Sequence, residues 1–222
     1  TVRVDEKILN FFQTRKKLLN EIKKNKINLY LNKEFKKNNL KNYDKVIIAT
    51  YSNNNNILSS LGIKKISTNK YQLVEKILIK LPKEYERKSY VVIDGNFVCV
   101  DPYLGTSYHL LSDVKLSKLE TLISKYPNFY SFKKRYLNKG LIKNIKVSRF
   151  RAFISNSSKY LPFLKKAKYI GSMFVVRALK INKESTDERV TSINYHNKKI
   201  ISVFSGKWNN CIYLAKNLNL KK

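Results

Sequence analysis

The residues of this chain best suited to chemistry are cations and aromatic side chains gathered between positions 143 and 189. Lysine and arginine neutralise phosphate groups, and aromatic rings stack on nucleobases because every base offers a π face. Both kinds within one segment favour the binding of RNA. The candidate RNA-binding residues are Lys143, Lys146, Arg149, Phe150, Arg151, Phe153, Tyr160 and Arg189.

Several of these side chains have a packing role as the alternative. Phe150 and Phe153 are three positions apart and point to opposite faces of a regular strand, so one of them belongs in a core. We expect Phe153 to be the core residue. Tyr160 suits the rim of a barrel as well as base stacking, and Arg189 suits a surface ion pair as well as a phosphate contact.

Residues arranged for catalysis or metal binding are harder to find. His109 and His196 have no carboxylate or cysteine at the spacing of a metal site. The acidic cluster at 184–188 falls near an expected turn, where solvated carboxylates are usual. With only 6 glycines, the chain shows neither a phosphate-binding glycine loop nor a G-x-S-x-G motif. We therefore expect no enzyme activity, no cofactor, no metal and no small-molecule substrate.

The charge balance indicates a polyanionic partner. The 222 residues include 46 Lys and Arg against 15 Asp and Glu, a net charge of +31. Part of the lysine excess fits coding DNA rich in A and T, yet the low acid count still favours nucleic acid. An anionic membrane surface would also attract this charge. The apolar runs fall short of the roughly 20 residues that span a bilayer, and we expect no membrane partner.

The N-terminal half is expected to mix helices and strands. Residues 1–45 predict a basic helical extension, with a helix over 5–27 and an exposed connection over 32–45. Residues 46–134 predict a mixed region. In order, it holds a strand at 45–51, a polar turn at Asn53–Asn56, a hairpin around Asp94 and Gly95, and a helix over 113–126.

The C-terminal half predicts strands. Residues 135–200 are expected to form five of them, and 201–222 a C-terminal extension. Cys99 and Cys211 suit buried thiols, and Trp208 suits a packing residue. The fold class is therefore α+β and mainly β. The expected strands are 140–147, 149–157, 160–163, 167–182 and 188–196.

Three stretches, KGLIKNIKVSRFRAFI, YLPF and YIGSMFVVRALKINKESTDERVTSI, resemble the RNA-binding domain first named from ribosomal protein S-one. The chain departs from that domain at Arg151 and at Ser157 and Ser158, where glycines are usual, at Asn182 in place of an aspartate, and at Pro162 in place of a histidine. The matching positions are Gly140, Phe150, Phe153, Leu161, Pro162, Gly171 and Arg189.

The resemblance implies a five-stranded OB barrel over 135–200, with a degenerate OB-like unit before it. Organelle-encoded proteins of this family are similarly short and basic, which implies an rRNA-binding protein of the mitochondrial small ribosomal subunit, located in the matrix beside neighbouring ribosomal proteins. An accessory RNA-binding subunit of an RNA-processing or exonuclease complex is the alternative.

Overall fold

A computed structural model of the chain describes residues 2–5, 7–93, 97–181 and 190–220. It divides into two compact units, each built from three separated stretches. The first unit comprises Thr1–Asn32, Val74–Leu119 and Arg135–Val175, and the second Lys33–Leu73, Glu120–Lys134 and Val176–Lys222.

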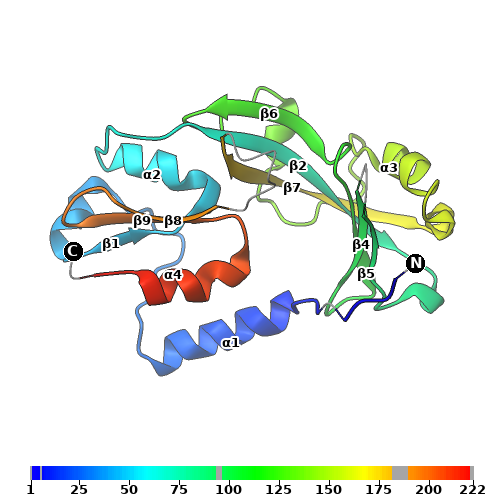
Figure 1. Ribbon diagram of the computed structural model, residues 1–222, viewed down its shortest axis with the longest axis horizontal. Coiled ribbons are helices and arrows are strands. Elements are labelled where there is room, and N and C mark those ends of the chain that lie inside the picture. The colour runs from blue at the N-terminus through cyan, green and yellow to red at the C-terminus, as the bar shows by residue number, and fades with distance from the viewer. Residues whose placement is uncertain (1, 6, 94–96, 182–189, 221–222) are drawn as a thin grey trace. The chain divides into compact units, whose positions relative to one another are not determined.

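Four α-helices and nine strands lie within the described residues (Figure 1). The helices are α1 Phe11–Lys24, α2 Asn54–Ser60, α3 Phe150–Ser157 and α4 Cys211–Asn217. The strands are β1 Val46–Ile48, β2 Asn69–Lys80, β3 Tyr90–Val92, β4 Val98–Tyr103, β5 Tyr108–Asp113, β6 Lys118–Ser124, β7 Lys168–Lys180, β8 Thr191–Tyr195 and β9 Ile200–Ser205. The 3-10 helices are η1 Lys37–Asn42, η2 Tyr51–Asn53, η3 Lys83–Tyr85, η4 Phe132–Tyr136, η5 Pro162–Lys166 and η6 Trp208–Asn210.

The strands form two sheets. The larger has the order β3-β4-β5-β2-β6, with β7 also paired to β2, and the smaller has the order β1-β9-β8. Neighbours β3–β4, β4–β5, β2–β5 and β8–β9 are antiparallel, while β1 and β9 are parallel. The expected α+β, mainly β class is confirmed. No closed barrel is formed by the residues that the structure describes.

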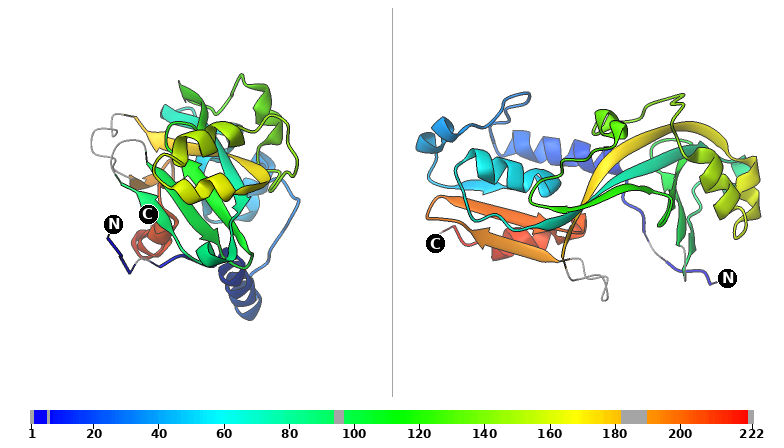
Figure 2. Two further views of the ribbon diagram at one scale, coloured as in Figure 1. Left: turned by 90° about the vertical axis from the view of Figure 1, so that its right-hand side faces the viewer. Right: turned by 90° about the horizontal axis from the view of Figure 1, so that it is seen from above.

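The core of the first unit lies between its strands and a helical layer. Alternate residues of β4 are buried, as expected of a sheet with one covered face. Helix α3 and η5 add Phe153 and Leu164, both completely buried, to this core. Figure 2 shows α3 lying over the strands of this unit. The strand residues of the cluster are Ile77, Ile79, Val98, Val100 and Leu111.

The second unit packs α2 against the three-stranded sheet, through a cluster of Ile48, Leu58, Leu61 and Ile200. The expected polar turn at Asn53–Asn56 is wrong, because α2 begins inside it and two of its amides are buried. Asn54 Nδ2 donates to the Val203 carbonyl at 2.8 Å. Asn55 Nδ2 donates to the carbonyls of Ser67 at 2.9 Å and Lys125 at 2.7 Å.

The expected helix over 113–126 is also wrong, since the chain turns after β5 and continues as β6. Asp113 Oδ1 accepts the backbone N–H groups of Lys115 and Leu116, both at 2.8 Å. A helix N-cap would accept the same donors, so the sequence signal of a cap and of this turn coincide. The Asp113 carbonyl then accepts Ser117 N–H at 2.9 Å before the chain enters β6.

Three of the five expected barrel strands are not strands. Residues 140–147 hold only an isolated bridge, between Ile142 and Ser172. The expected strand over 149–157 is α3, and the expected strand over 160–163 gives way to η5, which starts at Pro162. The strands expected over 167–182 and 188–196 are confirmed by β7 and β8 within the described residues.

Expectations for the rest of the chain are met unevenly. Helix α1 confirms the N-terminal helix, and β3 and β4 form the expected antiparallel pair, although Asp94 and Gly95 lie outside the described residues. Cys99 is half-buried and Cys211 exposed, and Trp208 is 61% exposed, so the packing expected of Cys211 and Trp208 is wrong. None of the helices described has the length and apolar character to cross a bilayer.

Gly171 offers a direct test of the packing within β7. A Cβ atom there would lie 2.5 Å from the Ile142 carbonyl oxygen and 2.8 Å from Leu141 Cδ1. Because the oxygen is backbone and belongs to the bridge with Ser172, it cannot simply rotate away. We expect Gly171→Ala to lower the free energy of unfolding by about 2 kcal/mol. Urea unfolding measures this loss. Gly140→Ala is the comparison, because Gly140 has a φ of +69° and no atom within 4 Å of the added Cβ, so its loss reports backbone strain without a steric contact.

Candidate nucleic-acid interface

Helix α3 divides the expected RNA-binding residues between two faces. Phe150 and Phe153 are one helical turn apart and both turn inward, Phe153 with no exposed surface and Phe150 against Tyr169. Arg151 lies on the opposite face and is exposed. The expectation of a core role for Phe153 is confirmed. The opposite-face argument for the two rings is wrong, because it assumed a strand.

Exposed cations lie in α3 and in the segments on either side of it. Lys143 and Lys146 lie in the loop before the helix, and Lys159 follows its last turn. We call this set, with Arg151, Lys165 and Lys166, the α3 surface. Tyr160 is 51% exposed beside Lys159, which leaves its ring accessible for stacking. Arg189 lies outside the described residues.

Arg149 is placed differently from these cations. It is half-buried, and its Nη1 donates to the carbonyl oxygens of Leu116 at 3.1 Å and Lys118 at 3.2 Å. Its backbone N–H donates to Glu75 Oε2 at 3.1 Å. Arg149 therefore joins α3 to the turn before β6, which makes it a structural residue of this surface.

The buried acids near α3 are satisfied by uncharged donors. Glu75, with no exposed surface, accepts Ser148 Oγ at 2.6 Å and Ser172 Oγ at 2.7 Å. Asp113, equally buried, accepts Asn156 Nδ2 at 2.6 Å besides its two backbone donors. These carboxyl groups thus occupy no lysine or arginine side chain of the α3 surface.

The distribution of acidic residues along the sequence also indicates this surface, and motif-by-motif reasoning did not use it. No Asp or Glu occurs between Glu120 and Glu184, a stretch that contains every cation of the α3 surface. An ordinary protein surface intersperses both signs of charge. A long acid-free segment favours a positive field able to attract a polyanion.

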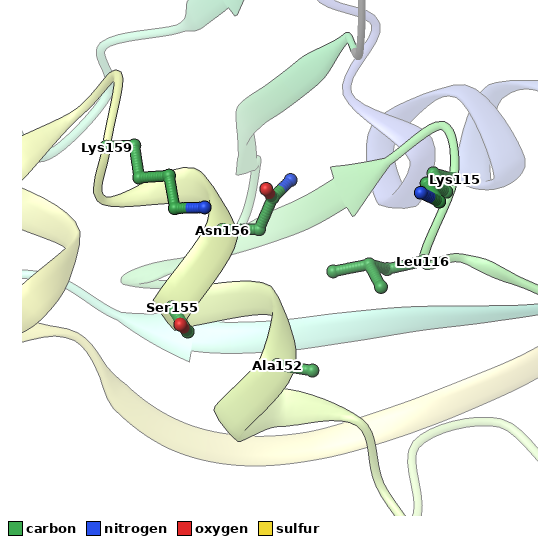
Figure 3. A pocket seen from close by; sticks show the side chains of 6 residues that line it. All are labelled: Lys115, Leu116, Ala152, Ser155, Asn156 and Lys159. Atoms are coloured by element: carbon green, nitrogen blue, oxygen red, sulfur yellow. The ribbon is translucent and has the colours of Figure 1, made fainter.

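A small pocket opens in the same region, between α3 and the turn after β5 (Figure 3). Its volume is about 240 Å³. Lys115 and Leu116 line it from the turn, and Figure 3 shows Lys159 on the other side beyond the end of α3. The remaining lining residues are Ala152, Ser155 and Asn156.

Neither histidine is among the residues that line this pocket. Burial is the largest influence on the pKa of His109 and lowers it, while the backbone of Tyr85 and Lys88 acts in the opposite direction. Burial also lowers the pKa of His196, whose Nε2 lies 2.8 Å from Ser202 Oγ. Within the described residues, no group of His, Cys, Asp and Glu is placed to hold a metal ion.

In the second unit, Lys180 has a role that the sequence did not suggest. Its Nζ donates to Asn69 Oδ1 at 3.1 Å and lies 5.0 Å from the centre of the Phe204 ring. Burial lowers the pKa of the Lys180 amine. The Lys180 amine therefore already has partners within the second unit, which makes it a poor candidate for contact with phosphate.

No family model matches the chain, and neither does any curated protein. Among solved structures, glycine oxidase from Geobacillus kaustophilus is similar at a TM-score of 0.46 and 10% identity, covering 75% of this chain and 37% of that one. Iminodiacetate oxidase (IdaA) from Chelativorans sp. BNC1 is similar at 0.43 and 12% identity, covering 73% and 37%. The chain thus spans little more than a third of either oxidase, and likeness at these scores transfers neither fold nor activity.

Proposed function

We propose that this chain is a structural, non-enzymatic rRNA-binding protein, a component of the small subunit of a mitochondrial ribosome. The observation that carries the proposal is the acid-free segment 121–183, which supplies the exposed cations in and on either side of α3. Phosphate contacts supply most of the sequence-independent affinity for RNA, and a surface without acids offers many.

The proposal depends on charge and not on a closed barrel. The segments that resemble the first three strands of the S-one domain fold as a loop, α3 and η5, so the stacking platform of that domain has no counterpart at Phe150 and Phe153. Tyr160 remains the exposed aromatic residue among the expected contacts. We assign it base stacking.

The experiment that tests this function is sedimentation of a mitochondrial lysate through a sucrose gradient at about 100 mM salt, where charges are screened beyond about 10 Å. The chain is expected to move with the small ribosomal subunit and to shift to the top of the gradient after RNase treatment. Comigration with an exonuclease or RNA-processing complex would instead favour the accessory-subunit alternative. A position that RNase does not change contradicts RNA binding itself.

A further inference from the structure

The pocket beside α3 is too small for a complete ligand of ordinary size. Pockets for small molecules usually measure about 300 to 1,000 Å³, whereas this one has about 240 Å³. A cavity of this size suits one group of a longer molecule whose remainder lies on the surface outside. Two lysines, Lys115 and Lys159, line the pocket, so a polyanion suits the longer molecule.

A single buried carboxyl group holds both walls of the pocket. Asp113 Oδ1 accepts the backbone N–H groups of Lys115 and Leu116, which fixes the turn. Asp113 Oδ2 accepts Asn156 Nδ2 at 2.6 Å, which fixes the side chain on α3. Because Asp113 has no exposed surface, water does not compete for these bonds, and the pocket is organised before any ligand arrives.

The bond to Asp113 also determines which atom of Asn156 remains available. A carboxylate accepts hydrogen bonds, so the amide nitrogen of Asn156 faces Asp113 and its Oδ1 keeps its acceptor capacity. Leu116 and Ala152 supply an apolar part of the lining. An acceptor beside apolar groups matches a nucleobase, which offers N–H donors on its edge and an apolar face.

We propose that this pocket takes one nucleobase of the bound RNA, with Asn156 Oδ1 accepting an N–H of its edge and Lys115 and Lys159 contacting the flanking phosphates. The inference rests on the proposed RNA-binding function. It makes the α3 surface a site that distinguishes a nucleic acid from polyanions without bases, since inorganic polyphosphate would satisfy the lysines and leave the pocket empty.

Filling the pocket tests this proposal without a change of charge. Ala152 is exposed on α3, and methionine is a good helix former, so Ala152→Met occupies the pocket and leaves the Asp113 bonds intact. Ala215→Met, at an exposed position of α4 that does not line the pocket, is the matched control. The probes are a 20-nucleotide single-stranded RNA of mixed sequence and inorganic polyphosphate of similar charge.

The expected result is a loss of about tenfold in RNA affinity for Ala152→Met, consistent with the stacking of one base, with polyphosphate affinity unchanged. Ala215→Met should match the wild type on both probes. The inference is overturned if Ala152→Met binds RNA as the control does, or if it loses both probes equally. A wild-type chain that fails to bind the RNA would instead overturn the proposed function.

Asn156→Ala provides a second variant for the hydrogen bond itself. We expect about a fivefold loss of RNA affinity, the effect of one hydrogen bond, and no loss toward polyphosphate. An equal loss toward both probes would mean that Asn156 acts only through the shape of the turn. Should this variant fail to fold because Asp113 loses a partner, Ala152→Met still decides the question.

Discussion

Replacing Glu75 by alanine is expected to lower the free energy of unfolding by about 4 kcal/mol. The change removes the common acceptor of the Ser148 hydroxyl, the Ser172 hydroxyl and the Arg149 N–H, and leaves the Ser172 hydroxyl only its contacts with Tyr169 Oη and Ser148 Oγ. Each buried donor left unsatisfied costs about 1 to 3 kcal/mol. The cavity left by the missing side chain adds to this loss, because Glu75 has no exposed surface. Urea unfolding followed by circular dichroism measures the effect.

Two further variants show whether burial is the cause. Glu75→Gln keeps one oxygen acceptor and the shape of the side chain, so it should lose about half as much. Glu120→Ala is the matched control, because the Glu120 carboxylate is likewise a hydrogen-bond acceptor. It accepts the backbone N–H groups of Tyr130 at 2.8 Å and Ser131 at 2.7 Å, but it is only half-buried. Water can replace its bonds, and we expect a loss near 1 kcal/mol. Equal losses for Glu75→Ala and Glu120→Ala would contradict the argument.

The Glu75 cluster bears on the proposed RNA binding because it anchors the start of α3. Ser148 and Arg149 immediately precede the helix and bind Glu75 on β2, while Ser172 on β7 joins the same oxygen as Ser148. These buried hydrogen bonds to Glu75 therefore fix the position of α3, and with it the position of its exposed face. A variant that breaks this cluster should also weaken RNA binding, although Glu75 itself is remote from solvent.

Much of the sheet could be predicted from the sequence. The runs that became β3, β4 and β7 alternate or are continuously apolar, and local pattern is sufficient for such strands. Helix α1 has a clear apolar stripe and an N-cap, Asn10, whose side chain accepts Gln13 N–H at 3.1 Å. These elements are encoded within a few residues of themselves.

The errors come from residues whose role depends on distant partners. Asn54 and Asn55 look like an exposed polar run, yet their amides bind carbonyls of Val203 and Lys125, far along the chain. Phe150 and Phe153 suit a strand as well as a helix. The segment forms a helix in which both rings pack against the strands of the first unit, and this tertiary contact outweighs the local preference. Sequence spacing alone cannot reveal such contacts.

The RNA-binding role of the candidate residues stays a prediction, and the structure shows only how each of them is placed. Lys143, Lys146 and Arg151 are exposed around α3, as a phosphate contact requires, whereas Arg149 and Phe153 are structural. Lys115 was not predicted, because it belongs to a turn that the sequence presented as a helix. Lys115 lies near α3 because Asp113 accepts hydrogen bonds both from the turn that contains Lys115 and from Asn156 on α3.

Neutralising four cations of the α3 surface is expected to cause the largest loss of RNA binding. The variant replaces four exposed cations by glutamine and so removes four potential phosphate contacts. The replaced residues are Lys143, Lys146, Arg151 and Lys159. For single strands, each contact contributes about 0.7 to the slope of log affinity against log salt. At about 0.1 M salt, four such contacts correspond to a loss of several hundredfold in affinity, and the slope should fall by about 3.

A control with the same change of net charge makes this prediction specific. Lys64, Lys65, Lys198 and Lys207 are exposed lysines of the second unit, and their replacement by glutamine alters the total charge equally. Fluorescence anisotropy with a labelled single-stranded RNA, over a range of salt, gives the affinity and the slope of both variants. If binding is concentrated at the α3 surface, the control keeps most of its affinity, because its substitutions remove none of the phosphate contacts of that surface. Equal slopes for the two variants would show that RNA binds diffusely to the whole basic chain, and the α3 surface would then lose its special role.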